Sequence, residues 1–299
     1  MPVPVSEIHN LSYSDHRIRR DNGYEQSAME TYVRMPAVAG QFYPANADTL
    51  RRALQSYTNV NGTKLNALGA IVPHAGYMYS GHVAGAVYGR LELPDRYVIL
   101  CPNHTGQGEP LAIMSEGSWM TPLGEIQIDA DLARRIMNGM PILRDDIEAQ
   151  RHEHALEVQL PFLQSLVRTF EFVPITVGTS RFEHLVALGD AIARAIEARG
   201  DHVMIIASSD MNHYETDSTT RVKDRKAIDR ILALNAAGLY DVIMKERVTM
   251  CGFGPAIAMI TATTAMGARS AELIRYATSG DVSGDRDAVV GYAGIAVTK

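Results

Sequence analysis

The stretch HVMIIASSDMNHY, residues 202–214, places a short apolar run directly before two polar side chains, Asp210 and His213. The apolar run contains several β-branched residues and predicts a buried strand. In an open α/β sheet, the loops that leave the carboxyl ends of the strands form the crevice in which ligands bind. We therefore expect Asp210 and His213 to face a crevice at the edge of such a sheet.

The rest of the chain repeats this alternation of apolar runs and helical segments. Short apolar runs predict further buried strands, and apolar residues at helical spacing predict helices between them. The alternation is typical of a single-domain α/β sandwich with a central, mixed but largely parallel sheet that helices cover on both faces. The expected strands are 67–73, 96–102, 170–178, 202–208, 270–278 and 288–297, and the expected helices are 46–57, 80–91, 152–170, 181–199 and 219–234.

Composition supports a single domain. Of the 299 residues, 46% are hydrophobic and 21% are charged, which is typical of a soluble globular protein. No Pro/Ser-rich or charged linker interrupts the chain after about residue 34, so we expect one domain over 34–299. Residues 1–33 mix charged, Ser, Asn and Tyr residues without sustained periodicity, and we expect them to form a loosely ordered extension.

Charge and hydropathy exclude two classes of partner. The formal net charge is -6 and the basic residues are scattered, so we expect neither a nucleic-acid partner nor binding to an anionic membrane surface. No apolar stretch reaches the roughly 18 to 20 residues of a membrane span and the N-terminus carries no secretory leader, which favours a cytoplasmic location. The two cysteines, Cys101 and Cys251, are then expected to be free thiols.

Three of the expected strands each deliver a histidine to what should be the same edge of the sheet. The histidines that follow these strands are His74, His104 and His213. A single loop histidine means little, but three at one edge favour a shared site. The other side chains that these loops would bring to the pocket are Tyr77, Tyr79 and Asn103, and either tyrosine could donate to a bound ligand.

Cys251 opens a fourth stretch, CGFGPAIAMITATTAMG (251–267), in which Pro255 and an apolar helical pattern follow a glycine-rich start. This pattern places Cys251 in a tight turn just before a helix. The positive end of the helix dipole favours a thiolate at such a position, which suits either metal ligation or nucleophilic attack.

A fifth stretch, RHEHALEVQLPFL (151–163), carries Glu153, His154 and Glu157. His154 and Glu157 are three residues apart and would share one face of a helix, which Pro161 should bend. Two interpretations stay open. The stretch is either an acidic first turn that complements the helix dipole, or a set of side chains that orients a ligand imidazole.

The chemistry of these side chains suits a transition metal. Imidazole and thiolate together bind Zn, Cu or Fe, whereas Mg and Ca prefer oxygen ligands. Three protein ligands would leave an open position for water, substrate or dioxygen. Asp210 and His213 would then form a general acid/base pair in which Asp210 fixes the tautomer of His213.

Two other functions use the same side chains without a catalytic metal. In a cysteine-dependent hydrolase, Cys251 would be the nucleophile, His213 the base and Asp210 the group that orients it. In a non-enzymatic module, the cleft would bind a peptide or protein. In each case we expect a small-molecule or peptide ligand at the sheet edge, and the apolar helices leave room for a homo-oligomer.

Six stretches, in this order, resemble the Memo-like family, which is named for a mediator of cell motility in animals and is widespread in bacteria and archaea. The resemblance runs from about residue 34 to the C-terminus, and six ordered motifs make it specific. The stretches are RMPAVAGQFYP (34–44), PHAGYMYSG (73–81), PNHTG (102–106), EHALEVQLPFL (153–163), SSDMNHY (208–214) and CGFGP (251–255).

The resemblance implies a fold similar to that of the class III extradiol dioxygenases, which hold non-haem Fe(II) with two His and one Glu and use a further His in catalysis. On that pattern His74 and His104 would be metal ligands, and Cys251 would stand where those enzymes have Glu. His213 would be the catalytic histidine, with Asp210 in the same motif. A thiolate in place of the carboxylate argues against ring cleavage and favours a softer metal such as reduced copper. The family thus implies a metal-dependent oxidoreductase of unknown substrate that holds one ion, Fe(II) or Cu, with Zn as a third option.

Overall fold

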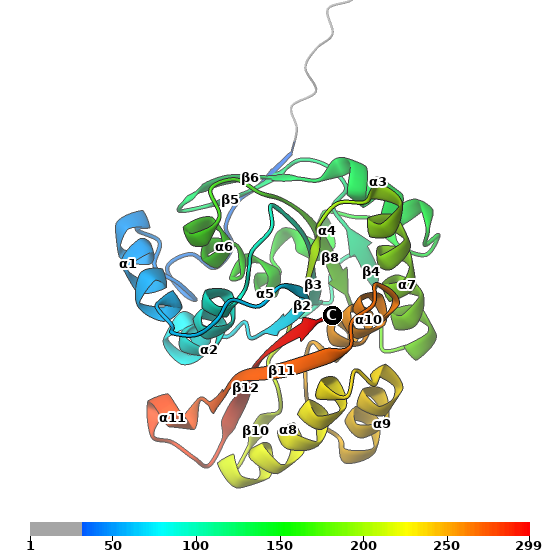
Figure 1. Ribbon diagram of the computed structural model, residues 1–299. Coiled ribbons are helices and arrows are strands. Elements are labelled where there is room, and N and C mark those ends of the chain that lie inside the picture. The colour runs from blue at the N-terminus through cyan, green and yellow to red at the C-terminus, as the bar shows by residue number, and fades with distance from the viewer. Residues whose placement is uncertain (1–31) are drawn as a thin grey trace, which may run out of the picture. The chain divides into compact units, whose positions relative to one another are not determined.

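The structure, a computed structural model, describes residues 32–299, in which strands and helices alternate along the chain (Figure 1). The strands are β1 (Val33–Arg34), β2 (Ala67–Val72), β3 (Arg96–Pro102), β4 (Leu111–Ile113), β5 (Ser118–Thr121), β6 (Gly124–Ile128), β7 (Arg144–Asp145), β8 (Glu171–Val177), β9 (Met204–Ser208), β10 (His213–Glu215), β11 (Ser270–Thr278) and β12 (Val289–Thr298). The helices are α1 (Ala47–Thr58), α2 (Tyr77–Arg90), α3 (Ala130–Asn138), α4 (Glu148–Arg151), α5 (His154–Glu157), α6 (Leu160–Leu166), α7 (Phe182–Arg199), α8 (Asp217–Leu232), α9 (Ala236–Glu246), α10 (Phe253–Ala265) and α11 (Gly280–Ser283).

One mixed sheet has the strand order β1-β5-β6-β8-β3-β9-β2-β12-β10, with β11 paired to β12 and β4 paired to β8. Its central strands β8, β3, β9 and β2 are parallel, and Val98 of β3 lies between Val173 of β8 and Ile205 of β9. β12 runs antiparallel to both β2 and β11. The predicted mixed, largely parallel sheet is confirmed.

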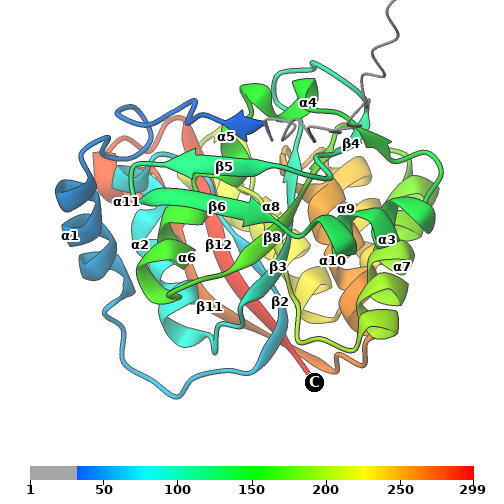
Figure 2. The same ribbon diagram turned by 90° about the horizontal axis from the view of Figure 1, so that it is seen from above.

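Side chains of the central strands alternate between two cores, one on each face of the sheet. In β3, Val98 and Leu100 pack with residues of α3, α7, α8 and α10, whereas Tyr97 and Ile99 pack with residues of α1, α2 and α6. Figure 2 shows α1, α2 and α6 on one side of the strands and α3, α7 and α10 on the other. The prediction that helices cover both faces is therefore confirmed.

The carboxyl ends of β3, β9 and β2 meet at one edge, because these strands are consecutive neighbours in the sheet and run parallel. β2 ends at Val72, β3 at Pro102 and β9 at Ser208. The loops that follow these residues are the ones for which the sequence predicts a common edge.

The helix expected over 152–170 is broken into α5 and α6 and ends at Leu166. Pro161 lies in the first turn of α6, where a missing N–H is tolerated, and it cannot donate to the carbonyl of Glu157 as a continuous helix would require. Glu153 caps α5, and its carboxylate accepts a hydrogen bond from Ala155 N at 2.9 Å. Glu153 and His154 therefore lie at the amino end of α5.

Several elements have no counterpart among the predicted ones, namely β1, β4 to β7, β10, α3, α4, α9 and α11. Of the expected extension 1–33, residues 1–31 lie outside the described residues, and Val33 pairs with Ser118 of β5. Within residues 32–299, no helix combines the length and the apolar character that crossing a membrane requires.

Candidate metal centre

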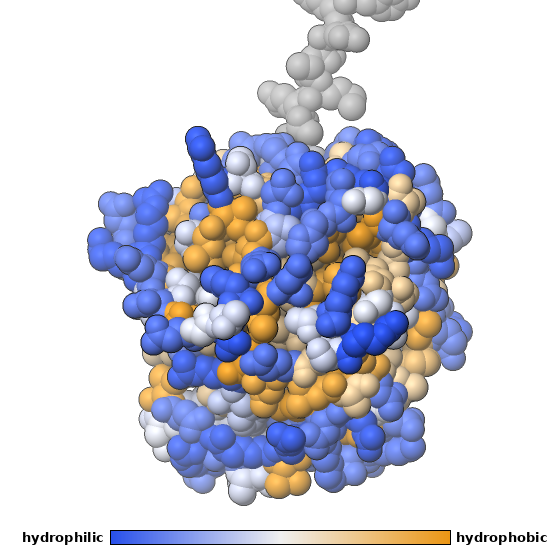
Figure 3. Space-filling view, in the orientation of Figure 1, coloured by the Kyte–Doolittle hydropathy of each residue, from blue (hydrophilic) through white to orange (hydrophobic). Residues whose placement is uncertain are grey.

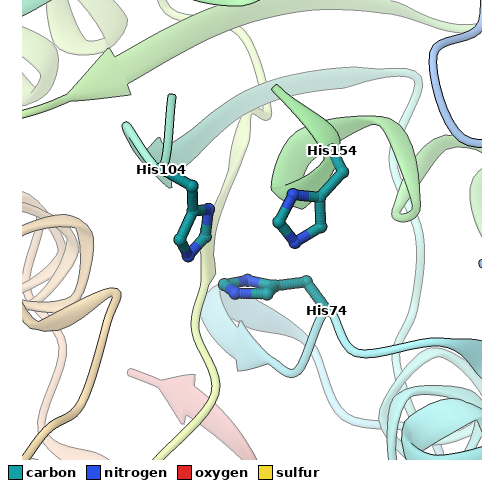
Figure 4. A group of neighbouring side chains, drawn as sticks. All are labelled: His74, His104 and His154. Carbon is teal, nitrogen blue, oxygen red and sulfur yellow. The ribbon is translucent and has the colours of Figure 1, made fainter. Parts of the chain in front are cut away.

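Three histidines at the carboxyl-end edge turn their rings toward one another (Figure 4). They are His74 after β2, His104 after β3 and His154 at the start of α5, and one nitrogen atom of each lies within 4.8 Å of those of the other two. The rings of His104 and His154 are stacked with centroids 4.7 Å apart, and His74 is nearly perpendicular to both. Among residues 32–299 this is the group of His, Cys, Asp and Glu side chains with the spacing to hold a metal ion.

Hydrogen bonds fix the tautomer of His104. Its Nδ1 lies 2.9 Å from Glu153 Oε1, and its backbone N donates to Glu153 Oε2 at 2.6 Å. Burial acts to raise the pKa of Glu153, but the hydrogen bonds from His104 and from Ala155 N outweigh burial and lower it. The carboxylate is therefore ionised and only accepts, so His104 Nδ1 is the donor, and in the neutral ring the lone pair lies on Nε2.

A second set of hydrogen bonds fixes His74 in the same tautomer. Its Nδ1 lies 3.0 Å from Ser208 Oγ, and the Ser208 hydroxyl donates its own hydrogen bond to the carbonyl of Ala155 at 2.6 Å. Ser208 Oγ also accepts from Gln159 Nε2 at 2.8 Å. Because the hydroxyl proton is already donated, His74 Nδ1 must be the donor, and His74 Nε2 also presents a lone pair.

The environment keeps the buried imidazoles neutral. His74 is 2% exposed, and burial, followed by the nearby His104 and His154, holds the pKa of His74 well below its usual range. Burial also lowers the pKa of His154, with Glu153 opposing the shift. Neutral imidazole is the form that ligates metals, so the donor set fits a transition-metal ion.

Cys251 adds a sulfur atom to this group. Its Sγ lies 3.2 Å from His74 Nε2 and 3.7 Å from the carbonyl of Asp210. The residue directly precedes Gly252, the N-cap of α10, as the sequence predicts. A Cβ on Gly252 would come within 2.4 Å of Ser208 O, so only glycine lets this turn approach β9 closely enough to bring Cys251 to His74.

The protonation of Cys251 differs from the expectation based on the helix dipole. Burial, with a smaller contribution from the nearby Asp210, raises the pKa of the thiol far above its usual range. Without a cation, Cys251 therefore carries its proton rather than a negative charge, because the desolvation penalty of the thiolate exceeds the favourable effect of the α10 terminus.

Asp210 contacts His74 rather than His213, and this corrects one expectation. Asp210 Oδ1 accepts from His74 N at 2.7 Å, and Oδ2 lies 4.0 Å from His74 Nε2. His213 Nδ1 instead donates to the carbonyl of Thr249 at 2.9 Å. Thr249 thus fixes the tautomer of His213, because a carbonyl oxygen can only accept a hydrogen bond.

Burial shifts the pKa values of both Asp210 and His213. Burial raises the pKa of Asp210 to about 7, despite the backbone hydrogen bonds that it accepts. Burial also lowers the pKa of His213. His213 lies outside the group of three histidines that are close enough to share an ion.

Three more predicted residues have structural partners. Tyr77 is 4% exposed and its hydroxyl donates to the carbonyl of Val158 at 2.6 Å, which argues against donation to a ligand. Asn103 Oδ1 accepts from Gly106 N at 2.8 Å and so shapes the loop that carries His104. Tyr79 is partly buried and packs against a small apolar cluster that includes Tyr292.

Glu157, the remaining predicted residue, lies in a buried ion pair with Arg34. It also accepts hydrogen bonds from Ala37 N at 2.8 Å and from the hydroxyl of Tyr43 at 2.6 Å. The sequence reasoning missed Ser208, Gln159 and Arg34 as parts of the centre. All three lie in the stretches quoted above, but nothing in their spacing indicates which distant group they contact.

The opposite, amino-end edge of the sheet has a hollow of about 410 Å³ lined by residues of β6, α6 and the start of β8. Figure 3 shows apolar side chains over β5, β6 and α6, interrupted by charged ones. The Arg96 guanidinium at this hollow is paired with Asp129, Glu171 and Asp201. The hollow therefore has no donor set comparable to that of the histidines.

Comparison with known proteins agrees with this arrangement of motifs. Residues 34–296 match the family described as Memo-like protein. A MEMO1 family protein of Methanosarcina mazei is 45% identical over 267 residues, which is 89% of this chain and 99% of the relative. A MEMO1 family protein of Methanopyrus kandleri is 42% identical over 276 residues, covering 88% and 98%, and one of Pyrobaculum arsenaticum is 43% identical over 275 residues, covering 88% and 98%. With matches of this extent, the chain belongs to the Memo-like family.

Proposed function

We propose that this protein binds one transition-metal ion at the carboxyl-end edge of its sheet. His74 and His104 are the principal ligands, and His154 and Cys251 are the further donors beside them. The observation that carries the proposal is the hydrogen bonding of the two rings. His74 Nδ1 donates to Ser208 and His104 Nδ1 donates to Glu153, so the Nε2 atom of each neutral ring presents a lone pair. Groups that prearrange imidazoles in this way are typical of metal sites.

The donor atoms select the kind of metal. Imidazole nitrogen and a thiol suit iron, copper or zinc, whereas Mg and Ca prefer oxygen ligands. We propose iron or copper, and hence a metal-dependent oxidoreductase, because a mixed set of imidazole and thiol donors accepts these redox-active ions. A bound iron or copper ion would supply one-electron redox chemistry.

Asp210 and His213 would accept and donate the protons of such a reaction. Asp210 lies 4.0 Å from His74 Nε2 and can hold or release a proton near neutral pH. His213 keeps its Nδ1 proton on Thr249, so its Nε2 is the atom that would accept a proton. We propose a small molecule or a peptide as the ligand, in the cytoplasm, where Cys101 and Cys251 remain free thiols.

Metal analysis of the purified protein tests the proposal. Wild type and a His74→Ala, His104→Ala double variant are loaded anaerobically with iron or copper, desalted and measured by elemental analysis. A His152→Ala, His202→Ala double variant is the matched control, because both of these histidines are exposed. We expect about one equivalent of metal in wild type and control and a large loss in the first variant. Equal, negligible metal in all three proteins would contradict the proposal.

A further inference from the structure

Arg34 makes an unusual set of contacts for a residue of a two-residue edge strand. Its side chain is fully buried, and all three of its nitrogen atoms bind one short segment, residues 150–157. Nε donates to the carbonyl of Gln150 at 3.2 Å, and Nη2 donates to the carbonyl of Glu153 at 2.8 Å. Nη1 donates to the carboxylate of Glu157.

The surroundings of Arg34 hold the guanidinium rigidly. Its Cζ lies 4.2 Å above the ring of Trp119 in β5, a cation–π arrangement. Its partner Glu157 is also held by Tyr43 and by the backbone of Ala37, so the buried carboxylate has several hydrogen bonds. A buried charge is tolerated only where such partners compensate for lost water, and breaking one of them costs more than a surface pair would.

The segment that Arg34 holds is the one that supplies Glu153 and His154 to the metal centre. Arg34 binds the backbone carbonyl of Glu153, while the carboxylate of the same residue accepts from His104 N at 2.6 Å and binds His104 Nδ1 at 2.9 Å. A continuous chain of hydrogen bonds therefore runs from the edge strand β1 through Glu153 to the ring of His104.

We propose that Arg34 is a positioning residue for the metal centre. Its guanidinium fixes segment 150–157 so that Glu153 holds the Nδ1 proton of His104 and His154 faces His74. Arginine is required because its planar fork reaches two carbonyl groups and a carboxylate at once, whereas lysine offers a single point charge. The metal-binding part of this inference rests on the proposed function.

The test uses the full chain with Arg34→Lys, which keeps the charge opposite Glu157, and Arg34→Met, which removes it. Arg199→Met is the matched control, because Arg199 has only 15% of its side chain exposed and pairs with Asp129 and Asp201, away from the histidines. Two quantities are measured. Co²⁺ affinity is determined by competition with a chelator, and the tautomer of His104 in metal-free protein is read from the ¹⁵N shifts of its ring.

We expect Arg34→Lys to weaken Co²⁺ binding by about 10- to 100-fold, the usual effect of losing a group that orients a ligand. His104 should change from a single Nδ1–H tautomer to a mixture. Arg199→Met should match wild type in both measurements even where its melting temperature falls. A purely structural role for Arg34 would lower thermal stability and leave the tautomer unchanged.

A folded Arg34→Lys protein with wild-type Co²⁺ affinity and an unchanged His104 tautomer overturns the inference. If the wild type takes up no Co²⁺, the ¹⁵N shifts alone decide whether Arg34 orients His104, and the iron and copper loading decides the proposed function separately. If neither Arg34 variant folds, Glu157→Gln decides in their place. It retains Arg34 and removes its charged partner, so it should shift the tautomer in the same direction, and no shift would overturn the inference.

Discussion

Cys251 Sγ lies 3.2 Å from His74 Nε2, although 177 positions separate the two residues. Because Ser208 already takes the Nδ1 proton of His74, the Nε2 atom can only accept, and the thiol of Cys251 must donate to it. A metal ion that displaced this thiol proton would be coordinated by both Cys251 Sγ and His74 Nε2, and its binding would release the proton to solvent.

Cys251 should react slowly with iodoacetamide in the metal-free protein at neutral pH. Burial raises the pKa of its thiol, so the reactive thiolate fraction should be at least about tenfold below that of an exposed cysteine. Mass spectrometry of the alkylated protein measures the rate, and Cys251→Ser identifies the labelled site against the buried Cys101. Rapid labelling of Cys251 would favour the cysteine-dependent hydrolase instead.

Glu153→Gln should weaken metal binding without unfolding the protein. The amide has a single acceptor oxygen, so its NH2 group would face one of the two His104 N–H donors, and a neutral oxygen holds the Nδ1 proton less strongly than the ionised carboxylate does. We expect the affinity for Zn²⁺ to fall by about 10- to 100-fold in a chelator competition. Glu148→Gln is the control, since Glu148 pairs with Arg151 on the surface. An equal loss in both variants would show that Glu153 has no specific effect on the site.

Gly291→Ala should destabilise the fold strongly. A Cβ at Gly291 in β12 would lie 1.8 Å from Asp224 Oδ2, so the strand and α8 would have to separate. Overpacking of this kind costs about 1–3 kcal/mol, and the displaced carboxylate adds to that cost. Gly139→Ala is the matched control, because its nearest neighbour would be 3.4 Å away. Urea unfolding of both variants against wild type measures the difference, and similar midpoints would contradict this account.

The sequence could predict the strand ends that carry the site because apolar runs mark parallel strands and their carboxyl ends share an edge. β2, β3 and β9 follow that rule, and so His74 and His104 were found. The direction of a side chain within a loop follows a different rule. It depends on the backbone and side-chain dihedral angles of the loop, which the residue pattern does not show, and in this loop His213 contacts Thr249 instead of Asp210.

Contacts between residues far apart in the sequence were the other part of the site that the sequence could not predict. Arg34 and Glu157 are 123 positions apart, and their contact exists only because β1 pairs with β5 beside the start of α5. Pro161 predicted a bend in the helix expected over 152–170, but the structure shows a full break between α5 and α6. His154 is the first residue of α5 and lies close to the other two histidines, so a residue expected only to support the site is within ligand distance of its centre.

Asp224→Asn should change how stability depends on pH. Asp224 is fully buried in α8, and burial raises its pKa to about 7, although the hydrogen bonds from Tyr276 and Asn212 N act to lower it. In the unfolded chain an aspartate titrates near pH 4. The folded protein therefore binds this proton more tightly, and the stability linked to it is complete below about pH 4 and is lost as the pH rises to about 7.

An asparagine at this position has no proton to lose, so the variant should lack that decline. The unfolding free energy of wild type minus that of Asp224→Asn should fall between pH 4.5 and pH 7.5, by about 1–3 kcal/mol. Asp210, whose pKa burial also raises to about 7, titrates in both proteins and cancels in the difference. Urea unfolding at a series of pH values measures it. A difference that stays constant, or that grows with pH, would mean that Asp224 is already ionised in the folded protein, because only a carboxyl group that is protonated at acidic pH can make the wild type lose stability as the pH rises.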